Sequence, residues 1–540
     1  MKIKTNFNYL IIGFFFTFLL IGHLIFKDYL VTPDEPLHRI NGFISLKYIL
    51  EILSINFSSI TQFENVPNLY SDWRKTYGVI FDLPLAIIEI IFKLNIQEAF
   101  QLRHYSIFII FFISNIYFFL FLKKNLKDEK LALLGVMILI TTPRIFSHSF
   151  FNGKDILFLS LMVIASYYCL ELIKKYSFKN ILLACVFCAF ATNIRILGIY
   201  LPFLTCIFYF FLDNKFKTKK NNYFFGLFFF IYFCTLYIIW PFLWASPIDN
   251  FLLIFKESAF YPNHWNFKTL YLGNYFNPEN LPWHYFFVWF FSTTPIIFLI
   301  LILIGISIFL KKYLHFFLQL EFKKEIQIWK NKDQMISLFI FLSFFIPIFF
   351  VITINSTLYN GWRHLYFVYP SLIYLSLFGI KIFFELINNN KKRILLFFII
   401  LKIIINIFFI YKSHPIQNIY FNFVSKPLVK NILPVDYWGL GNKTTIDYLI
   451  SKKKIFSVSN ASFTPLINLK YSKKEDYSYL DNIEFLGTNE NLRETSDFIF
   501  TNYYYNRSPK NLEKFKIPKN YKSYYKLIID GITVNEVFIR

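Results

Sequence analysis

The sequence has few cysteines, no internal repeat and no glycine-rich loop of the kind that binds phosphate. All five cysteines lie inside apolar segments, so the sequence indicates neither a disulfide framework nor a zinc site. They are Cys169, Cys185, Cys188, Cys206 and Cys234. The candidates for chemistry are therefore carboxylates, histidines and basic side chains.

Acidic residues are also scarce, since 33 Asp and Glu stand against 56 Lys and Arg, a formal net charge of +23. Such a charge can mark a nucleic-acid-binding protein, but that function requires a basic face on a soluble domain. Here the basic residues form short clusters between apolar runs, which favours membrane orientation as the explanation and excludes nucleic acid as a partner.

Apolar residues are abundant instead. Hydrophobic residues make up 56% of the 540 residues and aromatic residues 22%, with a mean hydropathy of +0.46. A soluble protein of this length could not bury so much apolar surface, so lipid must surround most of the chain.

Residues 7–26 follow Lys2 and Lys4, have spanning length and precede no small-residue cleavage site. They predict an uncleaved first transmembrane helix with a cytoplasmic N-terminus. Further apolar runs bring the prediction to eleven spans, at 104–122, 131–147, 156–173, 181–194, 197–213, 222–244, 284–310, 335–355, 364–385 and 394–411.

The basic clusters predict the orientation, because Lys and Arg in short loops stay in the cytoplasm. Every second loop is basic, which places the alternate loops and the C-terminus outside. The predicted transmembrane domain covers 1–411, with a first outer loop at 27–103 and a fourth outer loop at 246–283. A span at 79–95 would invert every later loop, so we expect 79–95 and 37–53 to be juxtamembrane helices on the outer surface.

The composition changes after Tyr411, where Asn, Lys, Tyr, Ser and Asp replace the apolar blocks. Short β-like runs at 454–459, 497–501 and 532–539 alternate with a helical patch near 443–451. The sequence therefore predicts a small soluble α/β domain over 412–540, on the outer face.

The polar residues are organised around Val31–Ile40, directly after the first apolar run, which carries Asp34, Glu35 and His38. An acidic pair placed where a helix leaves the bilayer can act on a substrate anchored in the membrane. The same residues suit a helix N-terminus, where Asp34 caps and Glu35 complements the helix dipole. Position alone leaves both interpretations open.

Ionisable residues near lipid are costly, so those in the other outward segments are also functional candidates. They are Arg144, His148, Asn152, Lys154 and Asp155 in a turn at 143–155, Arg195 between two short spans, Arg363 and His364 in a loop at 359–364, and Lys402 near the middle of the last span. A guanidinium group suits a phosphate because its donor fork matches two oxygens. Capping by Asp155 and snorkelling of Lys154 and Arg195 are the structural alternatives.

The 246–283 loop is rich in aromatic residues that could stack on sugar rings. They are Tyr261, His264, Trp265, Tyr275 and Trp283, with His284 just beyond. An interfacial aromatic belt explains the same composition.

These features resemble the GT-C glycosyltransferases, and within them the protein O-mannosyltransferase and aminoarabinose transferase group known as glycosyltransferase family 39. The resemblance rests on Asp34-Glu35 after the first span, on Asp82 before Pro84, on the arginine-containing break at 192–198 and on the C-terminal domain. It is weaker at Leu83, where several relatives have lysine. The fold it implies is a GT-C-like helical membrane protein.

The resemblance implies an enzyme that takes a hexose or pentose from a polyprenyl phosphate carrier and passes it to a hydroxyl on a lipid, glycan or protein acceptor. Asp34 would be the general base, helped by Glu35 or Asp82, and the expected location is the bacterial inner membrane with a periplasmic C-terminal domain. The residues expected to bind the donor phosphate or the substrate are Asp82, His148, Lys154, Asp155, Arg195, Arg363 and His364. Some relatives use a divalent metal, Mg or Mn, which Asp34 and Glu35 would hold.

Two other functions fit parts of the sequence. A transporter or flippase of a lipid-linked solute requires charges near the bilayer midplane and inverted repeats, but apart from Lys402 the ionisable groups lie at outer ends of spans. A surface-polysaccharide polymerase or ligase usually relies on a large arginine-bearing outer loop, and the 246–283 loop has no arginine.

Overall fold

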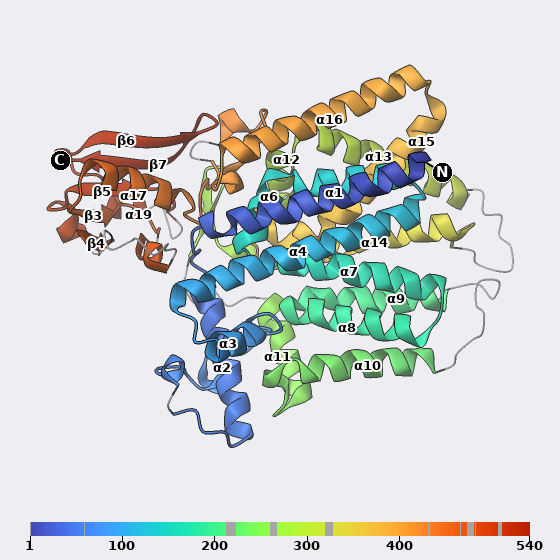
Figure 1. The fold of residues 1–540 in the computed structure, drawn as a ribbon, viewed down its shortest axis with the longest axis horizontal. Coiled ribbons are helices and arrows are strands. Elements are labelled where there is room, and N and C mark those ends of the chain that lie inside the picture. Colours follow the sequence, from blue (N-terminus) through green and yellow to red (C-terminus); the bar gives the residue numbers. More distant parts are fainter. Residues whose placement is uncertain are drawn as a thin grey trace.

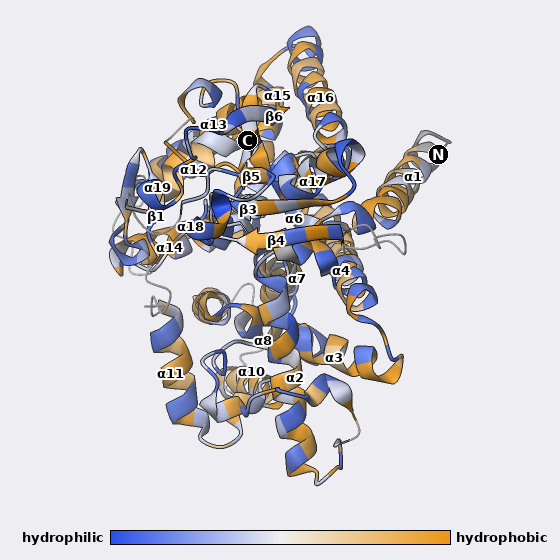
Figure 2. Ribbon diagram, turned by 90° about the vertical axis from the view of Figure 1, so that its left-hand side faces the viewer, coloured by the Kyte–Doolittle hydropathy of each residue, from blue (hydrophilic) through white to orange (hydrophobic). Residues whose placement is uncertain are grey.

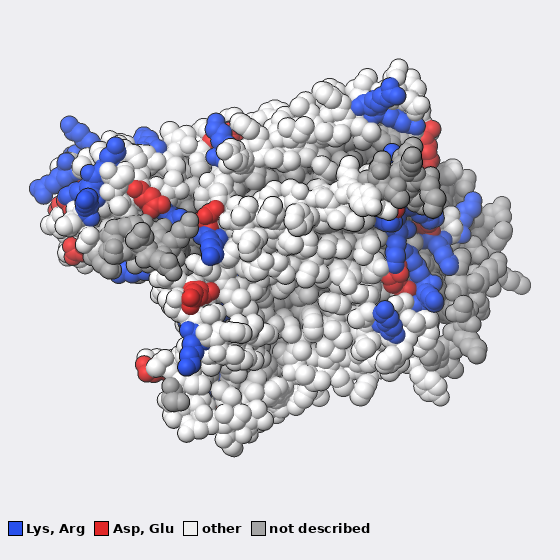
Figure 3. Space-filling view, viewed as in Figure 1, with Lys and Arg blue, Asp and Glu red and all other residues white. Residues whose placement is uncertain are grey.

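The computed structural model describes residues 2–58, 60–211, 223–259, 267–318, 328–429, 432–464, 466–471, 480, 482–505 and 510–540. Long helices run side by side, and a unit containing a β-sheet lies at one end of them (Figure 1). On the face shown in Figure 3, charged side chains gather at the two ends of the helices and the band between is almost free of them. This distribution is that of an integral membrane protein.

Seven helices in the described residues are long and apolar enough to cross a membrane. Their spans are Phe7–Asp28, Ile96–Leu126, Asp155–Lys174, Ile296–Phe316, Lys332–Thr353, Arg363–Leu386 and Asn389–Lys412. They correspond to the helices α1 (Lys2–Ile25), α4 (Ile96–Leu126), α7 (Asp155–Lys174), α13 (Ile296–Leu318), α14 (Lys332–Thr353), α15 (Tyr369–Leu386) and α16 (Asn389–Lys412). The predicted polytopic helical fold is confirmed.

The remaining predicted spans are bent or short. Helices α5 (Glu129–Ile140) and α6 (Pro143–Phe151) form a pair bent by 69°, which adds an eighth span if the two cross together. Three apolar helices are shorter than 18 residues, namely α8 (Phe178–Ile194), α9 (Tyr200–Phe210) and α10 (Phe224–Ile238). Length and composition thus support seven or eight spans within the described residues, and the count of eleven stays a prediction.

The segment predicted as an outer turn at 143–155 is mostly helix α6, all of whose residues are buried. Pro143 explains the difference, because its fixed φ favours the first position of a helix and its missing N–H ends the preceding one. The predicted span at 284–310 is likewise broken, into α12 (Tyr285–Thr293) and α13, at Thr294 and Pro295.

Three helices lie outside the bundle, at the end that carries the cavity described below. Helices α2 (Glu35–Ile52) and α3 (Asp82–Ile91) correspond to the expected juxtamembrane helices, and α3, at 10 residues, is about 15 Å long and too short to span. Helix α11 (Pro247–Ala259) shows apolar and polar residues in alternating bands (Figure 2), with Ile248 and Leu252 exposed. After it comes a small antiparallel hairpin of β1 (Thr269–Tyr271) and β2 (Asn274–Phe276).

The C-terminal part contains a five-stranded mixed sheet of order β4-β3-β5-β7-β6. Its strands are β3 (Phe456–Asn460), β4 (Ile483–Gly487), β5 (Phe498–Thr501), β6 (Lys522–Ile529) and β7 (Ile532–Ile539), with helices α17 (Gly441–Lys452), α18 (Glu490–Arg493) and α19 (Lys510–Lys514). Strand β3 is parallel to β4 and β5, whereas β7 is antiparallel to β5 and β6. The three predicted strands and the predicted helix therefore exist.

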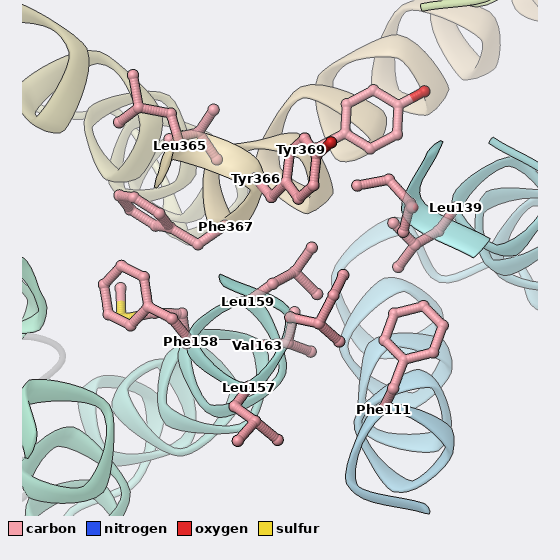
Figure 4. Close-up of a cluster of buried hydrophobic side chains, with 14 of the residues drawn as sticks. Phe111, Leu139, Leu157, Phe158, Leu159, Val163, Leu365, Tyr366, Phe367 and Tyr369 are labelled. Atoms are coloured by element: carbon pink, nitrogen blue, oxygen red, sulfur yellow. The ribbon is translucent and has the colours of Figure 1, made fainter. Parts of the chain in front are cut away.

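The core of the bundle lies between α4, α5, α7 and α15. Figure 4 shows the Phe158 ring of α7 beside the Phe367 ring, with 4.6 Å between the ring centres, and Phe111 and Leu139 on α4 and α5. The side chains of these residues are almost fully buried. This packing fixes the N-terminal ends of α7 and α15, next to the polar residues described below.

Candidate active site

A cavity of about 460 Å³ lies where four interruptions of the helices meet. These are the loop before α2, the turn before α7, the break between α8 and α9, and the loop that enters a 3₁₀ turn at Arg363–Val368. Its charged and imidazole-bearing lining residues are Asp34, His38, Lys154, Arg195, Arg363 and His364. Five of the predicted site residues, Asp34, Lys154, Arg195, Arg363 and His364, thus line one cavity.

Asp34 stands at the N-cap position of α2, but its side chain makes no capping hydrogen bond. The side chain is 41% exposed and lines the cavity, with Oδ2 3.9 Å from a terminal nitrogen of Arg363. Burial within the cavity walls raises the pKa of Asp34, and the charge of Arg363 opposes that rise. Of the two interpretations of this residue, the geometry favours the functional one.

Glu35 does not line the cavity. Its Oε1 accepts hydrogen bonds from the backbone N–H and the hydroxyl of Thr32, at 2.8 and 2.9 Å, and its Oε2 lies 2.8 Å from His104 Nε2. The carboxylate therefore holds the loop that presents Asp34. A catalytic role for Glu35 stays a prediction, and its position favours support of the loop.

Asp155 forms ion pairs with both arginines. Its side chain is fully buried; Oδ1 pairs with Arg195 and Oδ2 lies 3.0 Å from a terminal nitrogen of Arg363. Asn152 donates to Oδ2 at 2.8 Å and accepts from the Asp155 backbone N–H at 2.9 Å. A carboxylate can be buried at this depth because it has several charged and polar partners.

Neither arginine is satisfied by Asp155 alone. The Nε atoms of Arg195 and Arg363 and the Nε2 of His364 are buried and have no hydrogen-bond partner among the residues that the structure describes. Both arginines also line the cavity, and the Arg195 side chain is 28% exposed, so their positive charge is available to an acceptor bound there. A phosphate offers such an acceptor.

Lys154 supplies a third positive charge. Its Nζ donates to the carbonyl oxygen of Gly78 at 3.0 Å and lies 3.8 Å from Asp82 Oδ2. Burial lowers the pKa of this ammonium group. Asp82 also pairs with Arg103 at 2.8 Å and does not line the cavity, so its predicted contact with a substrate stays untested.

His148 is fully buried behind the cavity, where its Nδ1 lies 2.9 Å from Asn152 Nδ2. The analysis of the sequence missed two aromatic partners of Arg363, whose guanidinium carbon lies 4.8 Å from the ring centre of Tyr359 and 5.0 Å from that of Trp438. Tyr359 belongs to the loop predicted at 359–364, but nothing local in the sequence indicates that either ring packs on Arg363.

Phe255 and Phe267 of the 246–283 loop line this cavity, but none of the described aromatic residues expected to stack on a sugar does. Tyr261, His264 and Trp265 lie outside the described residues, and Tyr275 and Trp283 do not line the cavity. Stacking of these side chains on a sugar stays a prediction.

The acidic loop does not offer the ligands that Mg²⁺ or Mn²⁺ needs. These ions bind several oxygen ligands, but both Glu35 oxygens are engaged by Thr32 and His104, and Asp34 shares its cavity with three cations. Within the described part of the chain, no group of three or more His, Cys, Asp or Glu is arranged to hold a metal. The residues present therefore do not fit a metal at Asp34 and Glu35.

Gly78 gives a first prediction. A Cβ at this position would lie 1.6 Å from the carbonyl oxygen of Asn193, two residues before Arg195. Gly78→Ala is therefore expected to displace the α8–α9 break and to lower the unfolding free energy by about 1–3 kcal/mol, as overpacking does. Thermal unfolding in detergent measures the change. Gly226→Ala is the control, because a Cβ there meets nothing within 4 Å, and an equal loss in both variants would contradict the prediction.

Part of the sequence matches a known protein family. Residues 83–240 match the family model described as dolichyl-phosphate-mannose-protein mannosyltransferase. The predicted resemblance to membrane glycosyltransferases is confirmed. The predicted enzyme class, a glycosyltransferase, is confirmed with it. Within the mannosyltransferase match lie Lys154, Asp155 and Arg195, whereas Asp34 and Arg363 lie outside it.

Comparison with curated proteins found no match. Among solved structures, two of ArnT from Cupriavidus metallidurans are similar, one bound to undecaprenyl phosphate and one in the apo state. Each aligns with 99% of this chain and 98% of its own, at 11% sequence identity and a TM-score of 0.44.

Proposed function

We propose that the protein transfers a sugar from a polyprenyl-phosphate-linked donor to an acceptor hydroxyl, on the outer face of the membrane. The observation that carries this proposal is one cavity lined by a carboxylate, Asp34, and by three cations, of which Arg363 lies 3.9 Å from Asp34. Arg195 and Arg363 come from separate interruptions of the helices, and Lys154 from a third. The confirmed glycosyltransferase class supplies the reaction type, and the description of the family names a polyprenyl-type phosphate sugar as donor.

The charges match the bonds that this reaction makes and breaks. The bond between the anomeric carbon and the phosphate oxygen breaks, a bond from that carbon to the acceptor oxygen forms, and the acceptor proton passes to Asp34. The donor carries a phosphodiester with one negative charge, and the released carrier is a monoester that approaches two. Arg195, Arg363 and Lys154 would stabilise this growing charge, because fixed charges in a dry site need no reorganisation.

The rest of the cavity suits an apolar carrier. Its wall includes side chains from the outer half of α14 and from the start of α9. They are Leu197, Ile199, Tyr200, Ile346, Pro347, Phe350, Val351 and Ile354. A polyprenyl chain could lie against these residues while its phosphate meets the arginines, since apolar contact contributes roughly 25 cal/mol per Å².

The orientation of the protein follows from its charges. The end of the bundle opposite the cavity carries basic side chains that include Lys123, Lys124, Lys127 and Lys174. The positive-inside rule supports a cytoplasmic location for that end, and we propose that the cavity and the 412–540 domain lie on the outer, periplasmic side of a bacterial inner membrane. The first outer loop at 27–103 would then bring Asp34 to the cavity.

The proposal is tested by transfer of radiolabelled mannose from a polyprenyl phosphate donor, with purified protein in sealed vesicles and a water-soluble acceptor on one side only. Label should appear on the acceptor when it is on the side of the C-terminal domain. Transfer only from the opposite side would overturn the orientation. Movement of the donor between leaflets without any sugar transfer would contradict the proposed transferase activity and favour a flippase.

The pH dependence of this transfer gives a second prediction. Asp34 must be deprotonated to accept a proton, and burial raises its pKa above the value of about 3.9 that an exposed aspartate has. Activity should therefore fall as the pH falls through this raised pKa, and an acid limb of slope one should appear in log(kcat/KM). A profile that stays flat down to pH of about 4 would exclude Asp34 as the titrating base.

A further inference from the structure

Trp438 belongs to the C-terminal part of the chain, yet it reaches the back of the candidate active site. Its side chain is 4% exposed and its ring centre lies 5.0 Å from the guanidinium carbon of Arg363. The ring also packs edge-on against His148 and Phe151, at 6.0 and 5.6 Å between ring centres. Trp438 therefore fills the space between the arginine and helix α6.

The turn that carries Trp438 is fixed by hydrogen bonds to Asp436. This buried carboxylate accepts from the backbone N–H groups of Leu440 and Gly441 at 3.1 and 2.8 Å, and from Asn418 Nδ2 at 3.1 Å. Gly439 has a φ of +71°, a conformation that favours glycine. The ring therefore sits on a backbone with little freedom.

The β-sheet holds both this turn and the loop of Arg363. Asn502, directly after β5, donates through Nδ2 to the carbonyl oxygen of Asp436 at 3.0 Å. Tyr504 donates through its hydroxyl to Asn360 Oδ1 at 3.0 Å. Asn360 lies three residues before Arg363, so the sheet is linked to the arginine through two routes.

Arg363 is shared unequally between two carboxylates. It lies 3.0 Å from the buried Asp155 and 3.9 Å from Asp34, which faces the cavity. Without the Trp438 ring the guanidinium would have space to move, and the shorter pair with Asp155 would draw it away from Asp34. The aromatic contact opposes that movement, since a cation–π contact is strongest where water is excluded.

We infer that Trp438 is a positioning residue, which holds the Arg363 guanidinium where it faces both Asp34 and the phosphate of the donor. The C-terminal domain is then part of the transfer machinery rather than an appendage. This inference rests on the proposed function. This role for the turn at 436–441 does not follow from the charges of the cavity. It does not follow from the family match either, because that match ends at residue 240.

The test compares Trp438→Leu and Trp438→Phe with the wild type. Trp438→Leu should raise KM for the donor about 3- to 30-fold, the range that a buried cation–π contact supports, and weaken binding of polyprenyl phosphate by a similar factor without any turnover. Trp438→Phe keeps a ring and should restore most of both. Trp329→Leu is the matched control, because Trp329 is also buried and stacks on Phe208, outside the cavity lining.

The pH profile separates positioning from loss of structure. Arg363 holds down the pKa of Asp34, so Trp438→Leu should move the acid limb of kcat/KM to higher pH, and Trp329→Leu should not. The charged groups that act on Asp34 are Arg363, Asp155, Glu35 and Arg195. Of these, only Arg363 contacts the Trp438 ring among the described residues.

Three outcomes are decisive. A raised KM together with a shifted acid limb, both restored by phenylalanine, supports the inference. An unshifted limb, or equal losses in Trp438→Leu and Trp329→Leu with a matching fall in the unfolding temperature, overturns it while the proposed function stands. A wild-type protein that transfers no sugar and binds no polyprenyl phosphate overturns both.

Discussion

Replacing Asp34 by asparagine is expected to lower kcat/KM for sugar transfer about 10²–10⁴-fold, the contribution of a positioned general base. Asparagine has the same shape and can occupy the same N-cap position, so the fold should survive. The affinity for the donor should stay unchanged or rise, because the substitution removes a negative charge that faces the phosphate site. Initial rates at several donor concentrations measure both quantities.

Asp28→Asn is the matched control for this prediction. Asp28 ends the short turn after α1 and is 38% exposed, close to the 41% of Asp34, but it pairs with His414 and does not line the cavity. Its substitution should leave transfer within a few-fold of the wild type. If Asp34→Asn kept full activity, another group would have to accept the proton.

Replacing Asp155 by asparagine should have the largest effect on stability. Arg195 and Arg363 would lose their shared counter-charge, and removing one partner of a buried ion pair typically costs about 3–5 kcal/mol. Arg195 is 28% exposed and can turn toward water, so we expect about 3 kcal/mol. Transfer should also fall, because both guanidinium groups lose their fixed positions. Thermal unfolding in detergent and the transfer rate measure the two effects.

Asp333→Asn serves as the comparison for Asp155. Asp333 pairs with Lys127 at 2.9 Å, but both side chains are mostly exposed at the opposite end of the bundle. Exposed ion pairs contribute little, so this variant should unfold at the wild-type temperature. An Asp155→Asn protein as stable as Asp333→Asn would mean that the arginines do not depend on the buried carboxylate.

The secondary structure could be predicted well wherever one pattern runs without interruption. The seven long spans and the strands β3, β5 and β7 match apolar or alternating runs. The bend at Pro143 and the break before Pro295 were missed, because the apolar composition continues across them. Strand β6 was also missed, although Asp530-Gly531 between β6 and β7 is a common hairpin turn with positive φ at both residues.

The lining of the cavity could be predicted in part, because charges at the outer ends of spans are rare and visible. The sequence could not tell which of them face the cavity. Glu35 pairs with His104, 69 residues later in the chain, and therefore does not face the cavity. Asp155 likewise pairs with two arginines from other helices. Such pairings depend on tertiary contacts and leave no local pattern.

Besides Glu35, two contacts that hold the Asp34 loop come from the far end of the chain. Tyr29 donates to Gln417 at 3.0 Å across 388 residues, and Asn468 donates to the carbonyl oxygen of Val31 at 3.4 Å across 437 residues. A ribosome adds about 5–20 residues per second, so roughly 20–90 s separate the synthesis of the two sides. Until its last segment has been made, the nascent chain therefore lacks two of the hydrogen bonds that fix the backbone on the N-terminal side of Asp34.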